Sequence, residues 1–155
     1  PQNPFKEQKN LAKDRLRYHL VYLAIGDNPD IVASDIEFGL PKPSYTIDTL
    51  AYLHEKYPDK EFSLIMGGDN VPTLHKWKNS EILLERYKIY VYMRPGYELG
   101  PMADHSNIIA LEAPLLDISA TYIRKLLAHG KSVRYLLPEA VRIEVEKSNP
   151  YRDIQ

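Results

Sequence analysis

The sequence predicts an α/β fold with a doubly wound, mostly parallel sheet of about five strands and helices at the C-terminal end. Compact apolar runs such as residues 62–66 recur along the chain, as expected for strands buried on both faces. Segments with helical periodicity separate these runs, which is typical of βαβ units. Polar or glycine-containing turns follow the runs, and ligands of open α/β sheets bind beyond the carboxyl ends of the strands.

The first helix is expected at residues 10–25, where an apolar stripe is long enough to face a core. The stripe consists of Leu16, Leu20, Leu23 and Ala24. Residues 26–29, Gly-Asp-Asn-Pro, stop this helix. Residues 31–37 begin apolar and then alternate, which predicts a short strand.

A second helix is expected from Ser44 to Pro58, with Ser44 or Thr46 as its N-cap. Its buried face consists of Leu50, Leu53 and Tyr57. The elements expected next are strands at residues 62–66, 88–93 and 108–111 and short helical segments around residues 75–77 and at residues 81–86. Residues 98–107 are expected to form a surface loop.

A third long helix is expected after Ser119, whose hydroxyl can accept a bond from a free N–H of the first turn. Ile118 and Ile123 have the spacing of a hydrophobic staple, and Gly130 is a suitable C-terminal stop. The last helix is expected at residues 138–147, with Pro138 in its first turn.

The first turn after Ser119 lacks the acidic residues that a helix dipole favours, and Arg124 and Lys125 follow at once. Free N–H groups, two hydroxyls and a guanidinium are the parts of a phosphate site. Taken alone, this segment is better interpreted as an ordinary capped helix whose Arg and Lys side chains are solvated. Between residues 113 and 138, however, Asp117 is the only acid, and Lys131 and Arg134 add to the cations. In a chain of formal charge −1, this local basic run favours a small anionic ligand over a nucleic acid.

The composition limits the class of protein. A chain of 155 residues is expected to form one domain. It contains no cysteine, which excludes disulfides and fits a cytoplasmic protein. No apolar run approaches the length of a membrane span, so we expect no membrane partner. The sequence leaves open whether the protein forms a homo-oligomer.

Three residues outside the basic helix are candidates for ligand contacts. Gly67 and Asp69 follow a predicted strand, where glycine lets a ligand approach the backbone and a carboxylate can bind ribose hydroxyls. A tight turn in which Asp69 caps the next segment fits the same spacing equally well. Trp77 lies among polar neighbours, which suggests a partly exposed ring that can stack, although a lone Trp is more often a core residue. The five histidines show no metal-ligand spacing, so we expect no metal site.

Several segments together carry a resemblance to a known family. They are PQNPFK at residues 1–6, SYTIDTL at 44–50, GGDN at 67–70, Trp77, RPGY at 94–97, ISATYIR at 118–124 and VRYLLP at 133–138. In this order they resemble the bacterial nicotinate-mononucleotide (nicotinate-nucleotide) adenylyltransferases of the nucleotidylyltransferase superfamily, over essentially the whole chain. The Ser-x-Thr-x-x-Arg element marks the superfamily, whereas Ser-Tyr-Thr and Gly-x-Asp…Trp are similar to the nicotinate branch. The resemblance implies a Rossmann-like fold and transfer of AMP from ATP to nicotinate mononucleotide, giving deamido-NAD and pyrophosphate in NAD biosynthesis.

The resemblance also implies roles for individual residues. Those that would bind ATP are Gly67, Asp69, Arg94, Ser119, Thr121 and Arg124, and those that would bind the mononucleotide are Lys6, Tyr45, Thr46 and Trp77. Gly67 and Asp69 would hold the ribose of ATP, and Ser119, Thr121 and Arg124 would hold its β- and γ-phosphates. Trp77 would stack on the pyridine ring. Apart from the resemblance, Lys76 and Lys78 flank Trp77, where their charges can add positive potential for the nicotinate carboxylate. Mg²⁺ would accompany ATP.

This sequence differs from the family in one respect: it contains no His-x-Gly-His motif. In the family, the imidazoles of that motif contact the reacting phosphate. We expect it upstream of Pro1, in a strand–helix unit of roughly thirty residues, so that residues 1–155 are a single nucleotidyltransferase domain without that unit. Ala120, where the family often has Ser or Thr, is a milder change. The alternatives are a sister adenylyltransferase acting on nicotinamide mononucleotide or phosphopantetheine, and a truncated non-catalytic nucleotide-binding module.

Overall fold

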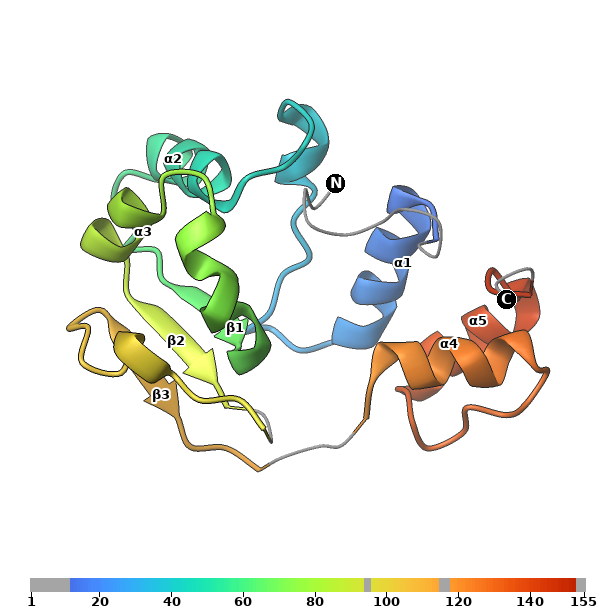
Figure 1. Ribbon diagram of the computed structural model, residues 1–155. Helices are drawn as coiled ribbons and strands as arrows, with labels where there is room; N and C mark the ends of the chain where they lie inside the picture. The colour runs from blue at the N-terminus through green and yellow to red at the C-terminus, as the bar shows by residue number, and fades with distance from the viewer. Residues whose placement is uncertain (1–11, 94–95, 115–117, 153–155) are drawn as a thin grey trace. The chain divides into compact units, whose positions relative to one another are not determined.

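The computed structural model describes residues 12–93, 96–114 and 118–152. The chain divides into two compact units (Figure 1). The sheet unit comprises Pro43–Leu115, and the helical unit comprises Pro1–Lys42 together with Leu116–Gln155. Each unit has its own cluster of buried apolar side chains.

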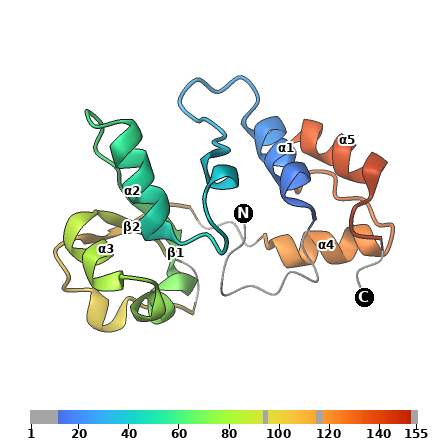
Figure 2. The ribbon, with the colours of Figure 1, turned by 90° about the horizontal axis from the view of Figure 1, so that it is seen from above.

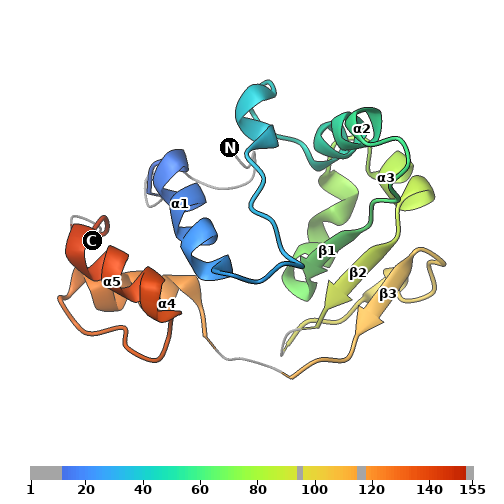
Figure 3. The same cartoon turned by 180° about the vertical axis from the view of Figure 1, so that it is seen from behind.

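The sheet unit is built on a parallel sheet with the strand order β1-β2-β3. Its strands are β1 (Leu64–Gly67), β2 (Ile89–Tyr92) and β3 (Ile108–Leu111). Leu64 pairs with Ile89, which in turn pairs with Ile108, and the three strands run the same way in Figure 3. The Rossmann-like α/β class is therefore confirmed, with three strands in the described residues.

Helical segments precede and connect these strands. They are α2 (Thr46–Lys56), η3 (Gly68–Lys76), α3 (Ser80–Arg86) and η4 (Gly100–Met102), where η marks a 3-10 helix. The segments η3 and α3 both lie between β1 and β2, as the sequence predicted for residues 75–77 and 81–86. Asn107, just before β3, donates from Nδ2 to the carbonyls of Leu84 and Glu85 at 2.8 and 3.0 Å, which ties α3 to the start of that strand.

The core of the sheet unit lies on one side of β1. Leu74, Leu83, Ile89 and Val91 are almost fully buried there, and Met66 joins them from β1. Ile65, the neighbour of Met66, is 71% exposed. The prediction that this strand is buried on both faces is therefore wrong, because successive side chains of a strand point to opposite faces and only one face of β1 meets the core.

The helical unit contains α1 (Asp14–Ile25), η2 (Ile36–Gly39), α4 (Ala120–Ala128) and α5 (Glu139–Ser148). Its core consists of Leu127, Val133, Val141 and Val145. Leu20 and Leu23 of α1 pack against this core, and α1 lies beside α5 (Figure 2). The predicted stripe of the first helix is thus confirmed at these two leucines, whereas Ala24 is exposed.

The strand predicted at residues 31–37 does not form. Ile31 and Val32 are 54% and 82% exposed, and the chain turns into η2 at Ile36. Ser34 Oγ accepts a hydrogen bond from the Ile36 N–H at 3.4 Å. A serine that bonds its own backbone two residues on favours a turn over a strand, which explains why the apolar pattern misled.

The helix ends give mixed results. Ser119 caps α4 as predicted, because its Oγ accepts a hydrogen bond from the Tyr122 N–H at 3.1 Å. For α2 the prediction of a Ser44 or Thr46 cap is wrong: Tyr45 occupies that position, without a capping hydrogen bond from its side chain. In the described residues, the Ser44 hydroxyl is buried and has no hydrogen-bond partner.

The C-terminal end of α4 forms a Schellman motif. Gly130 has φ +66°, in the left-handed region that favours glycine. Its N–H donates to the Leu127 carbonyl at 3.0 Å, and the Lys131 N–H donates to the Leu126 carbonyl at 2.9 Å. This confirms Gly130 as the stop of the helix. Among the described helices, none combines the length and the apolar character that a bilayer span requires.

Candidate functional site

The start of α4 brings together the three residues predicted to bind phosphates. Ser119 and Thr121 are exposed and Arg124 is half-buried. The Arg124 guanidinium donates from Nη2 to the Thr121 hydroxyl at 3.1 Å, which holds it over the first turn. No acidic residue lies in that turn. Unbonded N–H groups, the positive end of the helix dipole and a guanidinium together suit an anion such as a phosphate group.

The end of β1 places the second predicted pair. Gly67 is the last residue of the strand, and Asp69 lies exposed in the first turn of η3. The Asn70 side chain donates from Nδ2 to the Gly67 carbonyl at 3.2 Å, which fixes the turn between strand and helix. A carboxylate at the carboxyl end of a parallel strand lies where open α/β sheets bind their ligands.

The start of α2 and the end of η3 hold the remaining predicted residues of the sheet unit. Tyr45 precedes the first residue of α2, Thr46, and Trp77 directly follows η3. Tyr45 and Trp77 are both half-buried and pack against the core of the sheet unit. The partial exposure predicted for Trp77 is confirmed, and the residue also packs against the core.

An ion pair that the sequence did not reveal joins these two segments. The Lys78 ammonium lies 2.7 and 3.0 Å from the two carboxylate oxygens of Asp48, in the first turn of α2. It also lies 4.9 Å from the centre of the Tyr45 ring, within cation–π range. The residues are 30 positions apart, so no local spacing could have indicated the pair.

The predicted site residues divide between the units. Tyr45, Thr46, Gly67, Asp69 and Trp77 belong to the sheet unit, and Ser119, Thr121 and Arg124 belong to the helical unit. Lys6 and Arg94 lie outside the described residues. Within the described ranges, no group of three or more His, Asp or Glu side chains could hold a metal ion.

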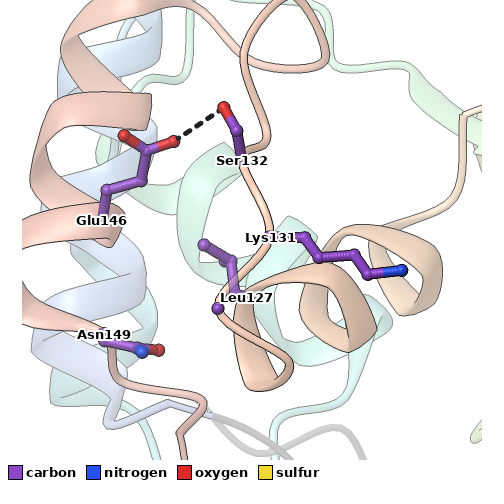
Figure 4. A pocket seen from close by; sticks show the side chains of 6 residues that line it. Leu127, Lys131, Ser132, Glu146 and Asn149 are labelled. Carbon is purple, nitrogen blue, oxygen red and sulfur yellow. Dashed lines mark hydrogen bonds between the residues drawn. The ribbon is translucent and has the colours of Figure 1, made fainter.

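Two cavities lie away from the predicted residues. One, of about 300 Å³, opens at the C-terminal end of α4, opposite the end that Ser119 caps (Figure 4). In it the Ser132 hydroxyl donates to the Glu146 carboxylate at 3.4 Å. The other, of about 520 Å³, is bordered by Phe62 and Tyr87, which precede β1 and β2. It therefore lies at the amino ends of these strands, away from Gly67.

Solved structures share the fold of this chain. A Plasmodium falciparum nicotinic acid mononucleotide adenylyltransferase complexed with NaAD aligns with a TM-score of 0.75, covering 97% of this chain and 78% of that chain at 17% identity. The structure of a Vibrio parahaemolyticus protein named "putative nicotinate-nucleotide adenylyltransferase" aligns with a TM-score of 0.70, covering 94% of this chain and 75% of that chain at 22% identity.

Sequence comparisons identify the family. The cytidylyltransferase-like family matches residues 1–126. A Cytophaga hutchinsonii protein named "probable nicotinate-nucleotide adenylyltransferase" is 50% identical over 141 residues, which cover 91% of this chain and 73% of the relative. A Flavobacterium johnsoniae protein of the same name is 47% identical over 154 residues, covering 98% and 80%. The chain therefore belongs to the cytidylyltransferase-like family and, within it, to the nicotinate-nucleotide adenylyltransferases.

Proposed function

We propose that this protein transfers AMP from ATP to nicotinate mononucleotide, giving deamido-NAD and pyrophosphate. The observation that carries the proposal is the start of α4, where a capped, acid-free first turn lies beside a guanidinium held by the Thr121 hydroxyl. An anion site of this kind suits the triphosphate of ATP. Membership of the nicotinate-nucleotide adenylyltransferases supplies the second substrate.

The proposal gives each predicted residue a substrate group to bind. Ser119, Thr121 and Arg124 bind the β- and γ-phosphates of ATP, and Gly67 and Asp69 bind its ribose. Tyr45, Thr46 and Trp77 bind the nicotinate end of the mononucleotide. Arg94 and Lys6 complete the ATP and mononucleotide sets. The divalent metal ion, Mg²⁺, arrives as part of the substrate, bound to the triphosphate.

The reaction is an in-line displacement at the α-phosphorus of ATP. A phosphate oxygen of the mononucleotide forms the new P–O bond while the bond to pyrophosphate breaks, and pyrophosphate leaves with its electron pair. No covalent intermediate with the protein is needed. The protein's contribution is to position the two phosphates and to stabilise charge that develops on the leaving group. Arg124, at the γ-phosphate end, supplies positive charge where pyrophosphate departs.

The proposal predicts the effect of replacing Arg124. Arg124→Ala removes a charge-assisted hydrogen bond to ATP and should weaken ATP binding by about 1.5–3 kcal/mol. The matched control is Lys125→Ala, which removes an exposed cation from the next position of the same helix and should leave ATP binding nearly unchanged. Calorimetric titration of the native full-length protein with MgATP measures both. Equal ATP affinity in wild type and Arg124→Ala, in a protein with an unchanged melting temperature, would show that α4 is only a capped helix.

A further inference from the structure

Lys78 joins two segments that are distant in sequence. It directly follows Trp77 at the exit of η3, and its ammonium meets both carboxylate oxygens of Asp48, at 2.7 and 3.0 Å. Asp48 lies in the first turn of α2, where its negative charge also interacts favourably with the helix dipole. The same ammonium lies 4.9 Å from the centre of the Tyr45 ring. One side chain therefore fixes the end of η3 to both the entry residue and the first turn of α2.

These two segments are the ones proposed to bind the nicotinate ring. Trp77 and Tyr45 both pack against the core of the sheet unit, but both keep an exposed part. Packing against a common core limits how far each can move, and the exposed ion pair adds a direct link between the two segments. A shift of about 1 Å in a substrate-positioning group is enough to weaken binding or catalysis measurably.

We propose that Asp48 and Lys78 form a clamp that positions Tyr45 and Trp77 for the pyridine mononucleotide. The inference rests on the proposed function and adds two positioning residues to it. Lys78 acts through Trp77 and Tyr45, and its charge is engaged by Asp48 instead of by the substrate's carboxylate. Because the clamp positions the residues that hold the ring, its loss should weaken the binding of both nicotinate and nicotinamide mononucleotides.

A direct contact between Lys78 and the nicotinate carboxylate would behave in the opposite way. The ammonium already lies against both carboxylate oxygens of Asp48, and the opposite charge of Asp48 argues against such a contact. If Lys78 did bind the carboxylate, Asp48→Asn would release the ammonium and strengthen nicotinate binding. Under the clamp, Asp48→Asn and Lys78→Met should weaken binding alike, so the sign of the Asp48→Asn effect separates the two roles.

The test is steady-state kinetics of the native full-length protein with both mononucleotides. Asp48→Asn and Lys78→Met should each raise the KM for both mononucleotides by about three- to tenfold, within what an exposed ion pair and a cation–π contact can supply. The KM for ATP and the kcat should stay within about twofold, and Lys78→Arg should restore most of the loss. The control is Lys88→Met, which removes a more weakly paired lysine of the same unit, 3.7 Å from Glu61, and should change no constant.

The outcomes separate the clamp from the proposed function. An unchanged mononucleotide KM in both variants, or a lower one in Asp48→Asn, would overturn the clamp. A wild-type protein that forms no deamido-NAD would instead contradict the proposed function. In that case, a double-mutant cycle on the free energy of unfolding still tests the pair: coupling between Asp48→Asn and Lys78→Met supports the clamp, and strict additivity overturns it.

Discussion

Trp77 illustrates how one residue can serve both the core and a ligand. It packs in part against the buried cluster of the sheet unit and remains partly exposed at the exit of η3. Trp77→Ala should therefore weaken both mononucleotides by roughly 1–3 kcal/mol, if stacking on pyridine resembles stacking on a nucleobase. The preference for nicotinate should survive, because stacking does not depend on the carboxylate.

Titration with each mononucleotide measures this effect, and Trp77→Phe serves as the control because it keeps an aromatic ring. The stacking role would be refuted if Trp77→Ala bound both mononucleotides as well as the wild type while melting at a lower temperature. That pattern is expected of a residue that contributes only to the core.

Single-residue roles followed from the sequence where chemistry and local spacing coincide. Ser119 was predicted as a cap from its position before an apolar helix, and the structure confirms it. The role of Lys78 could not be predicted in the same way, because its partner Asp48 is 30 residues away and only the folded chain brings them together. Ser44 shows the reverse case: its side chain is typical of a cap, but Tyr45 takes the position.

At the scale of the element, an ion pair joins the start of α1 to Lys42, the last residue of the helical unit before the sheet unit begins. Asp14, at the start of α1, accepts a hydrogen bond from Arg17 at 2.6 Å and one from Lys42 at 3.1 Å. The hydrogen bond from Arg17, followed by that from Lys42, holds the pKa of the Asp14 carboxyl well below its ordinary value. A carboxyl with a lowered pKa stabilises the folded state above the ordinary aspartate pKa of about 3.9, and this contribution is lost as the pH falls further.

Asp14→Asn should therefore lower the free energy of unfolding at pH 7 by about 1 kcal/mol, since the pair is partly exposed. The difference from the wild type should begin to narrow below a pH of about 4. Urea unfolding between pH 7 and pH 3 measures it, with Asp27→Asn, at an exposed aspartate after the same helix, as the control. A difference that stayed constant over this range would mean that the Asp14 charge does not stabilise the fold.

The elements also show which sequence signals are dependable. Both ends of α4 were predicted because Ser119 and Gly130 act through hydrogen bonds within a few residues of themselves. The strand expected at residues 31–37 failed because a strand needs a partner, and Ser34 offers the backbone a local turn instead. Ile65 was predicted to be buried from its apolar neighbours, but burial depends on where the core lies and not on hydrophobicity alone.

For the whole molecule, the sequence predicted the α/β class and a mostly parallel sheet, and β1, β2 and β3 form such a sheet in the described residues. It also predicted the family, because motifs spread over the chain occur in the family's order. The organisation as a single domain stays a prediction, and the roles assigned to Lys6 and Arg94 are proposals on residues outside the described ranges. The clamp formed by Asp48 and Lys78 became visible only in three dimensions.

The central claim is adenylyl transfer to nicotinate mononucleotide, and a substrate comparison tests it most directly. The native full-length protein is assayed with MgATP and either nicotinate or nicotinamide mononucleotide, following pyrophosphate and the dinucleotide product. In the proposed site, N–H donors at the start of α2 bind the carboxylate of nicotinate. In nicotinamide an NH2 group would face the same donors without an acceptor, which should cost a few kcal/mol of binding. We expect deamido-NAD and pyrophosphate in equal amounts and a kcat/KM for nicotinate mononucleotide at least a hundredfold higher, which corresponds to about 2.7 kcal/mol. Equal efficiency on the two mononucleotides, or no dinucleotide from either, would contradict the account.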